Sequence, residues 1–368
     1  MTRAAVMYDF MTPLEVVEVE LREPAPDEVV VRMAASGMCR TDLSVIQCKL
    51  PYPPPVVLGH EGAGVVESVG SGVRHLKPGD RVVLSGITHC GRCRYCLDAT
   101  PHLCPTGVQA AIDGQDYVFR RNGEDIARFV GLGTFAERTV VRASQAIQIT
   151  DDIPLDRACL IGCAVITGVG AVFNTARLRP GETAAVFGCG GVGLNLIQGA
   201  LIAGASQVIA VDTDPAKLEV ATRFGATATV QPTNEDDAPE AIQALTGGLG
   251  VDYAFEAVGQ AGVIRQAFMA VKRGGRAVVV GVPGFGVDVE LPACLFALEG
   301  RSILGSLFGD AHMARDVPRL IALERQGRLD LEGLITRRID LSDINDAMDA
   351  LDRGDGVRSV IIYPEVSA

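Results

Sequence analysis

A chain of 368 residues is too long for one ordinary hydrophobic core, so the length predicts two domains. Hydrophobic residues make up 48% and charged residues 21%, the balance of a folded protein, and the net charge of −12 excludes general attraction to nucleic acid or anionic membranes. The chain has no apolar stretch near the ~20 residues of a spanning helix and no signal-peptide core. We therefore expect a cytoplasmic protein whose ten cysteines are thiols or metal ligands.

The first half of the chain predicts a β-rich domain. Short strand candidates at 16–19, 28–33, 64–69 and 81–84 are separated by Pro, Gly and Asp turns. This spacing favours a compact, barrel-like arrangement. Around residue 151 the pattern changes to longer helices and buried strands, which predicts a domain boundary near residue 165.

Four cysteines of the first half lie within fifteen residues. Two C-x-x-C steps and a return after eight residues let one loop surround a tetrahedral ion, and four thiolates leave Zn²⁺ no open position. The sequence therefore predicts a structural zinc held by Cys90, Cys93, Cys96 and Cys104. The alternatives are an iron–sulfur cluster, plain buried thiols and a nucleic-acid zinc finger. The acidic charge balance and the lack of a basic recognition helix argue against the zinc finger.

The second half centres on a glycine-rich turn between a buried strand, 183–187, and an apolar helix, 192–203. Between them stand glycines in G-x-G-x-x-G spacing: Gly188, Gly190 and Gly193. Such glycines let the chain turn sharply and let a pyrophosphate approach the backbone at the helix N-terminus. Asp212 ends the next strand, where its carboxylate favours the ribose of NAD and repels the 2′-phosphate of NADP.

Further strand candidates at 251–255 and 275–281 each follow a helical pattern. Alternating units of this kind predict an α/β fold with an open, mostly parallel, doubly wound sheet. After about residue 307 the sequence predicts a helix, a strand and a tail that closes on a strand at 357–362.

Metal-ligating residue types also lie far apart in the chain, at Cys39, His60 and Cys163. At these residues, at the four-cysteine loop and at 188–193, the chain resembles the zinc-dependent medium-chain alcohol dehydrogenases over essentially its whole length. The resemblance implies a Rossmann doubly wound sheet, residues 165–307, inserted in a discontinuous, β-rich, GroES-like catalytic domain. That catalytic domain would consist of residues 1–164 and 308–368, with the active cleft between the two domains.

The resemblance also implies roles for individual residues. The ligands of a catalytic zinc would be Cys39, His60 and Cys163. Asp42 would orient His60, Glu61 would lie behind the metal, and Thr41 would hydrogen-bond the substrate oxygen. The residues at cofactor-binding positions are Arg40, Thr167, Gly188, Gly190, Gly191, Val192, Gly193, Asp212, Lys217, Val280, Val282 and Arg358.

A zinc with three protein ligands keeps one position at which an alcohol can lose its proton near neutral pH, and a nicotinamide can accept the hydride. The resemblance therefore implies an NAD-dependent oxidoreductase for a primary alcohol and its aldehyde, with one catalytic and one structural zinc per chain. The stretch 105–134 resembles the extended loop of the larger, typically dimeric members. We expect a homodimer or homotetramer that acts on a small molecule, with no nucleic-acid or membrane partner.

Two departures from the family pattern bear on the substrate. Ser44 stands at the position of the relay histidine of liver-type members, and Gly86 stands where the pocket often has a large aromatic residue. The smaller residue widens the site toward bulky or aromatic alcohols, while Leu50 and Leu307 keep the pocket apolar.

Two other functions remain open. A thiol-adduct formaldehyde dehydrogenase would need a cationic pocket, which Arg120, Arg121 and Arg128 of the long loop could supply, although solvated loop charges are the more ordinary interpretation. A non-catalytic, zinc-stabilised NAD-binding redox sensor would be expected to lack a catalytic ligand or Thr41, and the chain retains them all.

Overall fold

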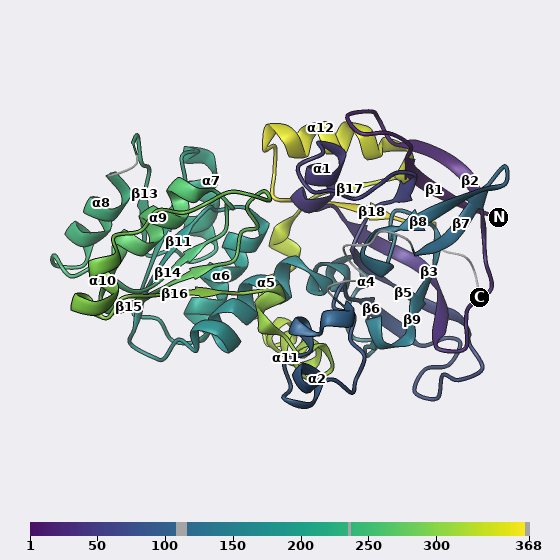
Figure 1. Ribbon diagram of the computed structural model, residues 1–368, viewed down its shortest axis with the longest axis horizontal. Coiled ribbons are helices and arrows are strands. Elements are labelled where there is room, and N and C mark those ends of the chain that lie inside the picture. Colours follow the sequence, from purple (N-terminus) through teal and green to yellow (C-terminus); the bar gives the residue numbers. More distant parts are fainter. Residues whose placement is uncertain (108–115, 235–236, 365–368) are drawn as a thin grey trace. The chain divides into compact units, whose positions relative to one another are not determined.

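The computed structural model describes residues 1–107, 116–234 and 237–364. The chain divides into two compact units, one formed by residues 1–163 together with the chain from residue 312 onward, the other by residues 164–311 (Figure 1). In Figure 1 the first unit carries the purple, blue and yellow ribbons, and the second carries the teal and green ribbons.

The first unit contains a closed barrel and a separate sheet. The barrel strands follow the order β1 (Thr2–Met7), β2 (Glu15–Leu21), β7 (Tyr117–Arg121), β8 (Glu124–Arg128) and β4 (Val56–Val57). The sheet follows the order β10 (Ala146–Gln148), β6 (Arg81–Leu84), β5 (Glu61–Val69), β3 (Glu28–Gly37), β18 (Arg358–Ile362) and β17 (Ile335–Ile339), and β9 (Arg138–Arg142) also pairs with β3.

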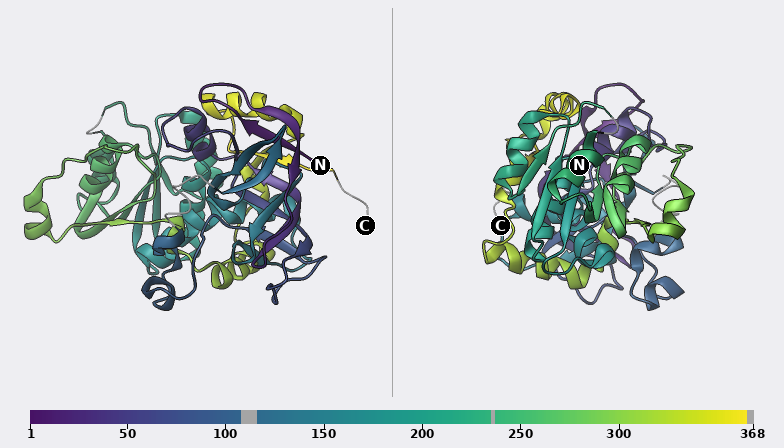
Figure 2. Two further views of the ribbon diagram at one scale, coloured as in Figure 1. Left: turned by 45° about the vertical axis from the view of Figure 1, so that its right-hand side comes forward. Right: turned by 90° about the vertical axis from the view of Figure 1, so that its left-hand side faces the viewer.

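Strand β3 lies at the centre of this sheet because it pairs antiparallel with β5, β9 and β18. Its register against β5 shifts twice, and such irregularities bend a strand and let it serve more than one partner. At its carboxyl end, Gly37 lies opposite both Glu61 of β5 and Val360 of β18. Three distant parts of the sequence therefore meet at one place, and Figure 2 shows the purple and yellow ribbons side by side there.

Helices pack around these strands. They are α1 (Arg40–Ile46), α2 (Arg94–Leu97), α4 (Leu155–Ala158), α11 (Met313–Arg325) and α12 (Ile344–Arg353), with shorter turns η1 (Pro101–Leu103), η2 (Phe129–Gly131), η3 (Ala143–Gln145), η4 (Cys159–Gly162), η7 (Glu332–Leu334) and η8 (Leu341–Asp343). Ile344, Ala347, Met348 and Leu351 of α12 have helical spacing and join the core of the barrel. This packing fixes α12 beside α1, which begins directly after the predicted metal ligand Cys39.

The stretch 105–134, which we expected to be an extended loop, contains the β7–β8 hairpin. Its turn residues Asn122 and Gly123 have φ values of 51° and 86°, the left-handed conformation required by a type I′ turn. The Asn-Gly dipeptide was a signal for this hairpin in the sequence. Residues 108–115 of the stretch lie outside the described part of the chain.

The second unit is built on a parallel sheet. The strand order is β13 (Ala228–Val230), β12 (Gln207–Val211), β11 (Thr183–Phe187), β14 (Val251–Glu256), β15 (Val271–Val279) and β16 (Ser302–Gly305). The helical segments are α5 (Ala164–Gly170), η5 (Ala171–Ala176), α6 (Gly191–Ile202), α7 (Pro215–Arg223), α8 (Asp237–Leu245), α9 (Ala261–Ala270), α10 (Ala293–Glu299) and η6 (Phe308–Asp310). The predicted doubly wound α/β fold is confirmed.

The strand order places the switch point of this sheet between β11 and β14. From β11 the chain moves outward through β12 and β13, then returns to β14 and moves outward on the other side. The two carboxyl ends are joined where Ala257 N donates to Phe187 O at 2.9 Å. Ligands of open parallel sheets bind outside such a switch point, and the glycine-rich turn follows Phe187 directly.

Among the described residues, no single helix is long and apolar enough to cross a membrane. The segments Leu155–Gly162 and Ala164–Ala176 pass the length and composition test only as a bent pair, and most of their residues are buried in the protein.

Candidate metal centres and dinucleotide site

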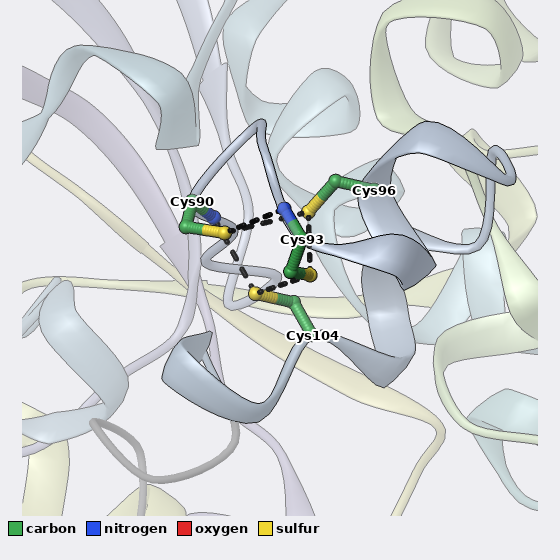
Figure 3. Close-up of side chains that lie close together, drawn as sticks. All are labelled: Cys90, Cys93, Cys96 and Cys104. Atoms are coloured by element: carbon green, nitrogen blue, oxygen red, sulfur yellow. Dashed lines mark hydrogen bonds between the residues drawn. The ribbon is translucent and has the colours of Figure 1, made fainter.

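The four cysteines of the loop converge as predicted (Figure 3). The sulfur of Cys93 lies 3.5 Å from that of Cys96 and 3.7 Å from that of Cys104, and the sulfurs of Cys90 and Cys96 are 4.0 Å apart. Four sulfurs at the corners of a tetrahedron, each ~2.3 Å from one zinc ion, would be about 3.8 Å apart. The cluster therefore fits a zinc with a closed coordination shell.

Backbone amides donate hydrogen bonds to sulfurs among these four cysteines, which we call the closed cluster. Cys93 N donates to Cys90 Sγ at 3.3 Å, and Cys90 N donates to Cys104 Sγ at 3.4 Å. Desolvation opposes ionisation of Cys104, but the N–H groups of Cys90 and Gly107 lower the pKa of this thiol to about 6. Such N–H donors favour the charged sulfur that a zinc ion requires.

A second cluster, which we call the open cluster, gathers Cys39, His60, Glu61 and Cys163. One ligand atom of each lies within 4.8 Å of all the others, and all four residues are buried. Cys39 follows β3 and caps α1, His60 and Glu61 stand at the start of β5, and Cys163 ends η4. The fold of the first unit thus brings together the ligands that the family resemblance named.

One carboxylate organises the open cluster. Asp42 Oδ1 accepts from Gly59 N at 3.0 Å and lies 3.0 Å from His60 Nδ1, while Asp42 Oδ2 accepts from Cys39 N at 3.1 Å. Asp42 thereby ties two prospective ligands to each other and is itself fully buried. Because Nδ1 of His60 is engaged by Asp42, Nε2 is the ring nitrogen left for a metal.

Glu61 adds a buried carboxyl group beside the two thiols. Among the described residues neither carboxylate oxygen has a hydrogen-bond partner, although Oε1 lies 3.6 Å from Arg358 Nη2. A Cβ added at Gly37 would lie 2.3 Å from Glu61 Oε2, so the glycine makes room for this carboxylate. A buried carboxylate without hydrogen bonds is costly unless a cation is near, and the donor set fits a divalent ion such as Zn²⁺.

The electrostatics of the open cluster favour a cation. Burial alone would lower the pKa of His60, but the Asp42 carboxylate holds it well above its usual value. The pKa of Cys39 lies well below its usual value, first because of the hydrogen bond from Cys163 and also because of nearby Arg358. Burial raises the pKa of Glu61 to about 7 against the opposing effect of Arg358. A positive ion would stabilise the Cys39 thiolate and the Glu61 carboxylate, and would bind His60 in its neutral form.

Of the other predicted site residues of the first unit, some lie beside the open cluster and one is exposed. Thr41 Oγ1 lies 3.6 Å from Cys39 Sγ, beside the open cluster. The guanidinium of Arg40 is exposed and donates to Leu351 O at 3.0 Å, whereas Arg358 is buried and donates to Met38 O. Arg358 therefore faces Glu61 of the open cluster, a position that its predicted cofactor-binding role alone did not suggest.

The glycine-rich turn of the second unit has the space that a dinucleotide needs. Gly188 has φ +92°, a Cβ at Gly193 would lie 1.8 Å from Gly188 O, and a Cβ at Gly190 would meet no described atom within 4 Å. The first glycine thus makes the turn, the last lets helix α6 approach strand β11, and the middle one leaves open backbone. This arrangement fits the pyrophosphate of a dinucleotide.

Asp212 braces the same turn. Its Oδ2 accepts from Cys189 N at 2.8 Å, and its Oδ1 accepts from Asp214 N at 3.0 Å. Lys217 lies half-buried in the first turn of α7. Burial, followed by the charge of Asp212, raises the pKa of Cys189 to about 12, so this thiol is an inert part of the turn.

The other predicted cofactor and pocket positions are distributed over both units. Gly191 is buried and Val192 half-buried in α6, Thr167 is half-buried in α5, and Val280 is 8% and Val282 68% exposed after β15. In the first unit Leu50 packs partly buried against the core and Gly86 is buried, whereas Leu307 of the second unit is 39% exposed.

The interpretation of the three arginines in the stretch 105–134 as solvated loop charges is wrong for Arg128. Arg128 is 1% exposed and forms ion pairs with Glu28 and Asp116, so it is not a solvated charge. Arg120 is exposed and pairs with Asp125, as expected of a surface side chain. Sequence reasoning missed the burial of Arg128 because it did not predict the hairpin that buries this side chain.

Sequence reasoning also missed Phe129 and Tyr52 near the open cluster. The Phe129 ring lies 5.6 Å from the imidazole of His60 at an interplanar angle of 78°, and 4.9 Å from the ring of Tyr52 at 81°. No local pattern in the sequence marks these residues, because their contacts depend on the tertiary packing of the hairpin.

A doubly wound sheet with this glycine-rich turn, in a chain with one closed and one open thiolate-rich cluster, defines a zinc-dependent dinucleotide dehydrogenase. Residues 25–151 match the family model described as an alcohol dehydrogenase GroES-like domain, and residues 191–324 match that of a zinc-binding dehydrogenase. The S-(hydroxymethyl)glutathione dehydrogenase of Synechocystis is 37% identical over 98% of this chain and 100% of its own length. The chain belongs to the zinc-dependent medium-chain alcohol dehydrogenases.

Solved structures agree with this assignment. Benzyl alcohol dehydrogenase from Acinetobacter calcoaceticus has a TM-score of 0.91 and 31% identity over 99% of both chains. A zinc-binding dehydrogenase from Sinorhizobium meliloti, bound to NADP, has a TM-score of 0.84 and 30% identity over 99% of both chains. The protein is thus an enzyme that acts on small molecules with zinc and a nicotinamide dinucleotide as cofactors.

Proposed function

We propose that the protein oxidises a bulky or aromatic primary alcohol to its aldehyde with NAD, and catalyses the reverse reduction, at the open cluster. The observation that carries this proposal is the buried set of Cys39, His60 and Cys163, held by Asp42 with one ring nitrogen of His60 left free. When bound, the zinc supplies a Lewis acid for the alcohol oxygen, and the nicotinamide supplies the hydride acceptor.

The residues of the chain would then act as follows. Asp42 fixes the tautomer and orientation of His60 through Nδ1. Thr41 Oγ1 accepts the hydroxyl proton of the substrate and passes its own proton on, because a hydroxyl is both donor and acceptor. Ser44 stands where liver-type members have a relay histidine, so no histidine would take the proton on from Thr41, and water would be its final acceptor.

The substrate class rests on Gly86. This buried glycine offers no side chain at a position where the family often has a large aromatic residue. A bulky or aromatic alcohol would occupy the space that remains, with Leu50 of the same unit as an apolar wall residue. The likeness to a benzyl alcohol dehydrogenase supports this choice.

A thiol-adduct formaldehyde dehydrogenase is the second candidate, because curated relatives are named S-(hydroxymethyl)glutathione dehydrogenases. Such a substrate carries carboxylates and would need free cations. Arg128 is buried in ion pairs, Arg121 donates to Tyr8 Oη, and Arg120 pairs with Asp125. These three side chains give little support to an adduct pocket, so we rank this function second.

We further propose a preference for NAD and assembly as a homodimer or a homotetramer. Asp212 would place its negative charge beside a 2′-phosphate, which disfavours NADP. Strand β16 ends the order of its sheet, and Leu298 of α10, the helix that precedes β16, is 80% exposed. An edge strand and an exposed apolar residue suit a contact between copies.

Turnover of a panel of alcohols tests the substrate. The panel compares benzyl alcohol, a long aliphatic alcohol and ethanol with formaldehyde plus glutathione, each with NAD and with NADP. The proposal expects the largest kcat/KM for benzyl alcohol with NAD, and expects Gly86→Phe to reduce the benzyl-to-ethanol ratio. Turnover that requires glutathione would instead establish the second candidate.

A further inference from the structure

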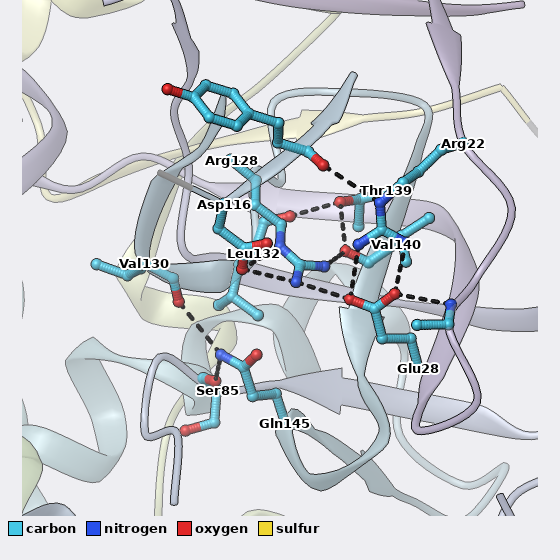
Figure 4. A network of polar contacts seen from close by, with 12 residues as sticks. Arg22, Glu28, Ser85, Asp116, Arg128, Val130, Leu132, Thr139, Val140 and Gln145 are labelled. Atoms are coloured by element: carbon cyan, nitrogen blue, oxygen red, sulfur yellow. Dashed lines mark hydrogen bonds and ion pairs between the residues drawn. The ribbon is translucent and has the colours of Figure 1, made fainter. Parts of the chain in front are cut away.

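The hairpin β7–β8 ends in a buried arginine that directly precedes Phe129, the residue whose ring contacts His60. Strand β8 ends at Arg128, the largest side chain among those that are fully buried. Its Nε donates to Asp116 Oδ2 at 2.9 Å and its Nη2 to Glu28 Oε1 at 2.9 Å, while Nη1 donates to Val140 O. The planar guanidinium is therefore held in one orientation from three sides (Figure 4).

Glu28 links this cluster to a second arginine. Arg22 donates to Glu28 Oε2 at 2.6 Å through Nη1 and to Glu28 Oε1 at 2.9 Å through Nη2. Burial would raise the pKa of Glu28, but the hydrogen bond from Arg22 and the charge of Arg128 lower it to about 2. Glu28 is therefore a permanent anion between two arginines. Buried ion pairs of this kind are poor sources of stability compared with apolar packing, which calls for another explanation of their presence.

Hydrogen bonds hold the backbone from Arg128 to Leu132 in place. Tyr52 Oη donates to Arg128 O at 2.8 Å, and Leu132 N donates to Phe129 O at 2.8 Å. Gln145 Nε2 donates to Val130 O at 3.2 Å (Figure 4). Val130 has φ 44° and ψ 34°, a left-handed conformation that is rare for a β-branched residue and persists only when its surroundings determine it.

Phe129 lies within the segment that these hydrogen bonds hold, and its ring contacts the imidazole of His60. Its ring is 4% exposed and meets the His60 imidazole edge-to-face at 5.6 Å, in the range preferred by aromatic pairs. On its other side it meets the ring of Tyr52 at 4.9 Å. The imidazole is thus restrained twice, by Asp42 at Nδ1 and by Phe129 against the ring.

We propose that the Arg128–Glu28–Asp116 cluster is a positioning device for the catalytic metal site, acting through Tyr52 and Phe129 on His60. This inference rests on the proposed role of His60 as a zinc ligand. Arg128 and Phe129 would act as positioning residues, through the orientation of His60. Their effect is to keep Nε2 of His60 aimed at the point shared with the sulfurs of Cys39 and Cys163.

The test measures metal loss from each cluster in the intact protein. Both clusters are loaded with Co²⁺, whose visible absorption reports thiolate and imidazole coordination, and transfer of the metal to a chelator is followed in Phe129→Leu. The matched control is Phe119→Leu, because Phe119 is a buried phenylalanine of the same hairpin, 1% exposed. Cobalt in the four-cysteine cluster is the reference within each molecule.

Phe129→Leu is expected to release cobalt from the open cluster roughly ten to a hundred times faster and to alter its absorption bands. Release from the four-cysteine cluster should stay unchanged, and Phe119→Leu should behave as the wild type at both clusters. Equal release rates for Phe129→Leu and Phe119→Leu would overturn the inference. A wild-type protein that holds no metal in the open cluster would instead refute the proposed function itself.

Tyr52→Phe gives a second, milder variant if Phe129→Leu folds poorly. It removes the hydroxyl that holds Arg128 O but keeps the aromatic ring. We expect faster release from the open cluster alone, and an effect in the double variant Tyr52→Phe/Phe129→Leu that is smaller than the sum of the single effects. Unchanged release in Tyr52→Phe would contradict the transmission through Arg128 O.

Discussion

The two ligand clusters of the first unit are built in opposite ways. The four cysteines of the closed cluster belong to one short loop, and three of them are only half-buried. The open cluster gathers residues from the end of β3, the start of β5 and the end of η4, all of them buried. Two N–H to sulfur hydrogen bonds link the cysteines of the loop, whereas the open cluster is held by Asp42 and the surrounding sheet. This difference predicts that one metal serves folding and the other serves chemistry.

Cys163→Ser should have the largest effect, and it tests whether the metal of the open cluster serves chemistry and not folding. Removing this ligand should reduce turnover to the detection limit with little change in the thermal midpoint, because the sheet keeps the other ligands in place. Steady-state kinetics and thermal unfolding measure the two effects. Cys159→Ser is the control, since Cys159 is buried in the same turn and its sulfur donates to Asp156 O. Comparable loss of activity in both variants would show that the ligand assignment is wrong.

Cys104→Ser should have the reverse effect on the closed cluster. Binding energy at a closed site is folding energy, so we expect a loss on the order of several kcal/mol of local stability. Limited proteolysis between residues 90 and 104 and chemical unfolding provide the measurements. Cys48→Ser, an exposed cysteine outside both clusters, should change nothing. A loop that resists protease without Cys104 would contradict a structural role for the metal.

Thr41→Ala tests the proposed proton transfer at the open cluster. The hydroxyl lies beside Cys39, and losing a positioned proton-transfer group costs roughly 10²–10⁴ in turnover. Ser44→Ala should change turnover little, because we route the proton past Ser44. Equal damage from the two substitutions, measured as kcat, would make Ser44 an essential link.

Asp42→Asn tests how far the open cluster is prepared before metal binds. The amide can no longer accept from Nδ1 of His60 as a charged oxygen does, so we expect metal affinity or activity to fall about 10–100-fold. Zinc release to a chelator measures the affinity, and the closed cluster in the same molecule is the reference. Equal acceleration at both clusters would point to general destabilisation.

The smallest expected effect concerns Glu28, whose ion pairs should make the free energy of unfolding depend on pH in the acid range. A pKa lowered from the ordinary 4.5 to about 2 gives stability that is fully present above about pH 4.5 and is lost as the pH falls through 2. The shift corresponds to at most about 3 kcal/mol. Unfolding free energies between pH 5 and 2 should fall less steeply for Glu28→Gln than for the wild type. Parallel slopes would contradict the ion-pair assignment.

Sequence predicted the local features better than the tertiary ones. The spacing of the four cysteines and the strand, glycines and helix around Gly188 require only short-range chemistry, and the structure bears out both. The open cluster could be named only through family resemblance, because its ligands meet across β3 and β5. The Asn122-Gly123 turn was readable, yet the burial of Arg128 by that hairpin required pairing with β2 and β4, which no local pattern shows.

The zinc content of the purified protein tests the central claim most directly. Metal analysis should find two zinc ions per wild-type chain, and one each in Cys163→Ser and Cys104→Ser. The zinc left in Cys163→Ser should resist a chelator, because its shell of four thiolates is complete. One zinc ion in the wild type, or the loss of both ions in either variant, would contradict two separate centres.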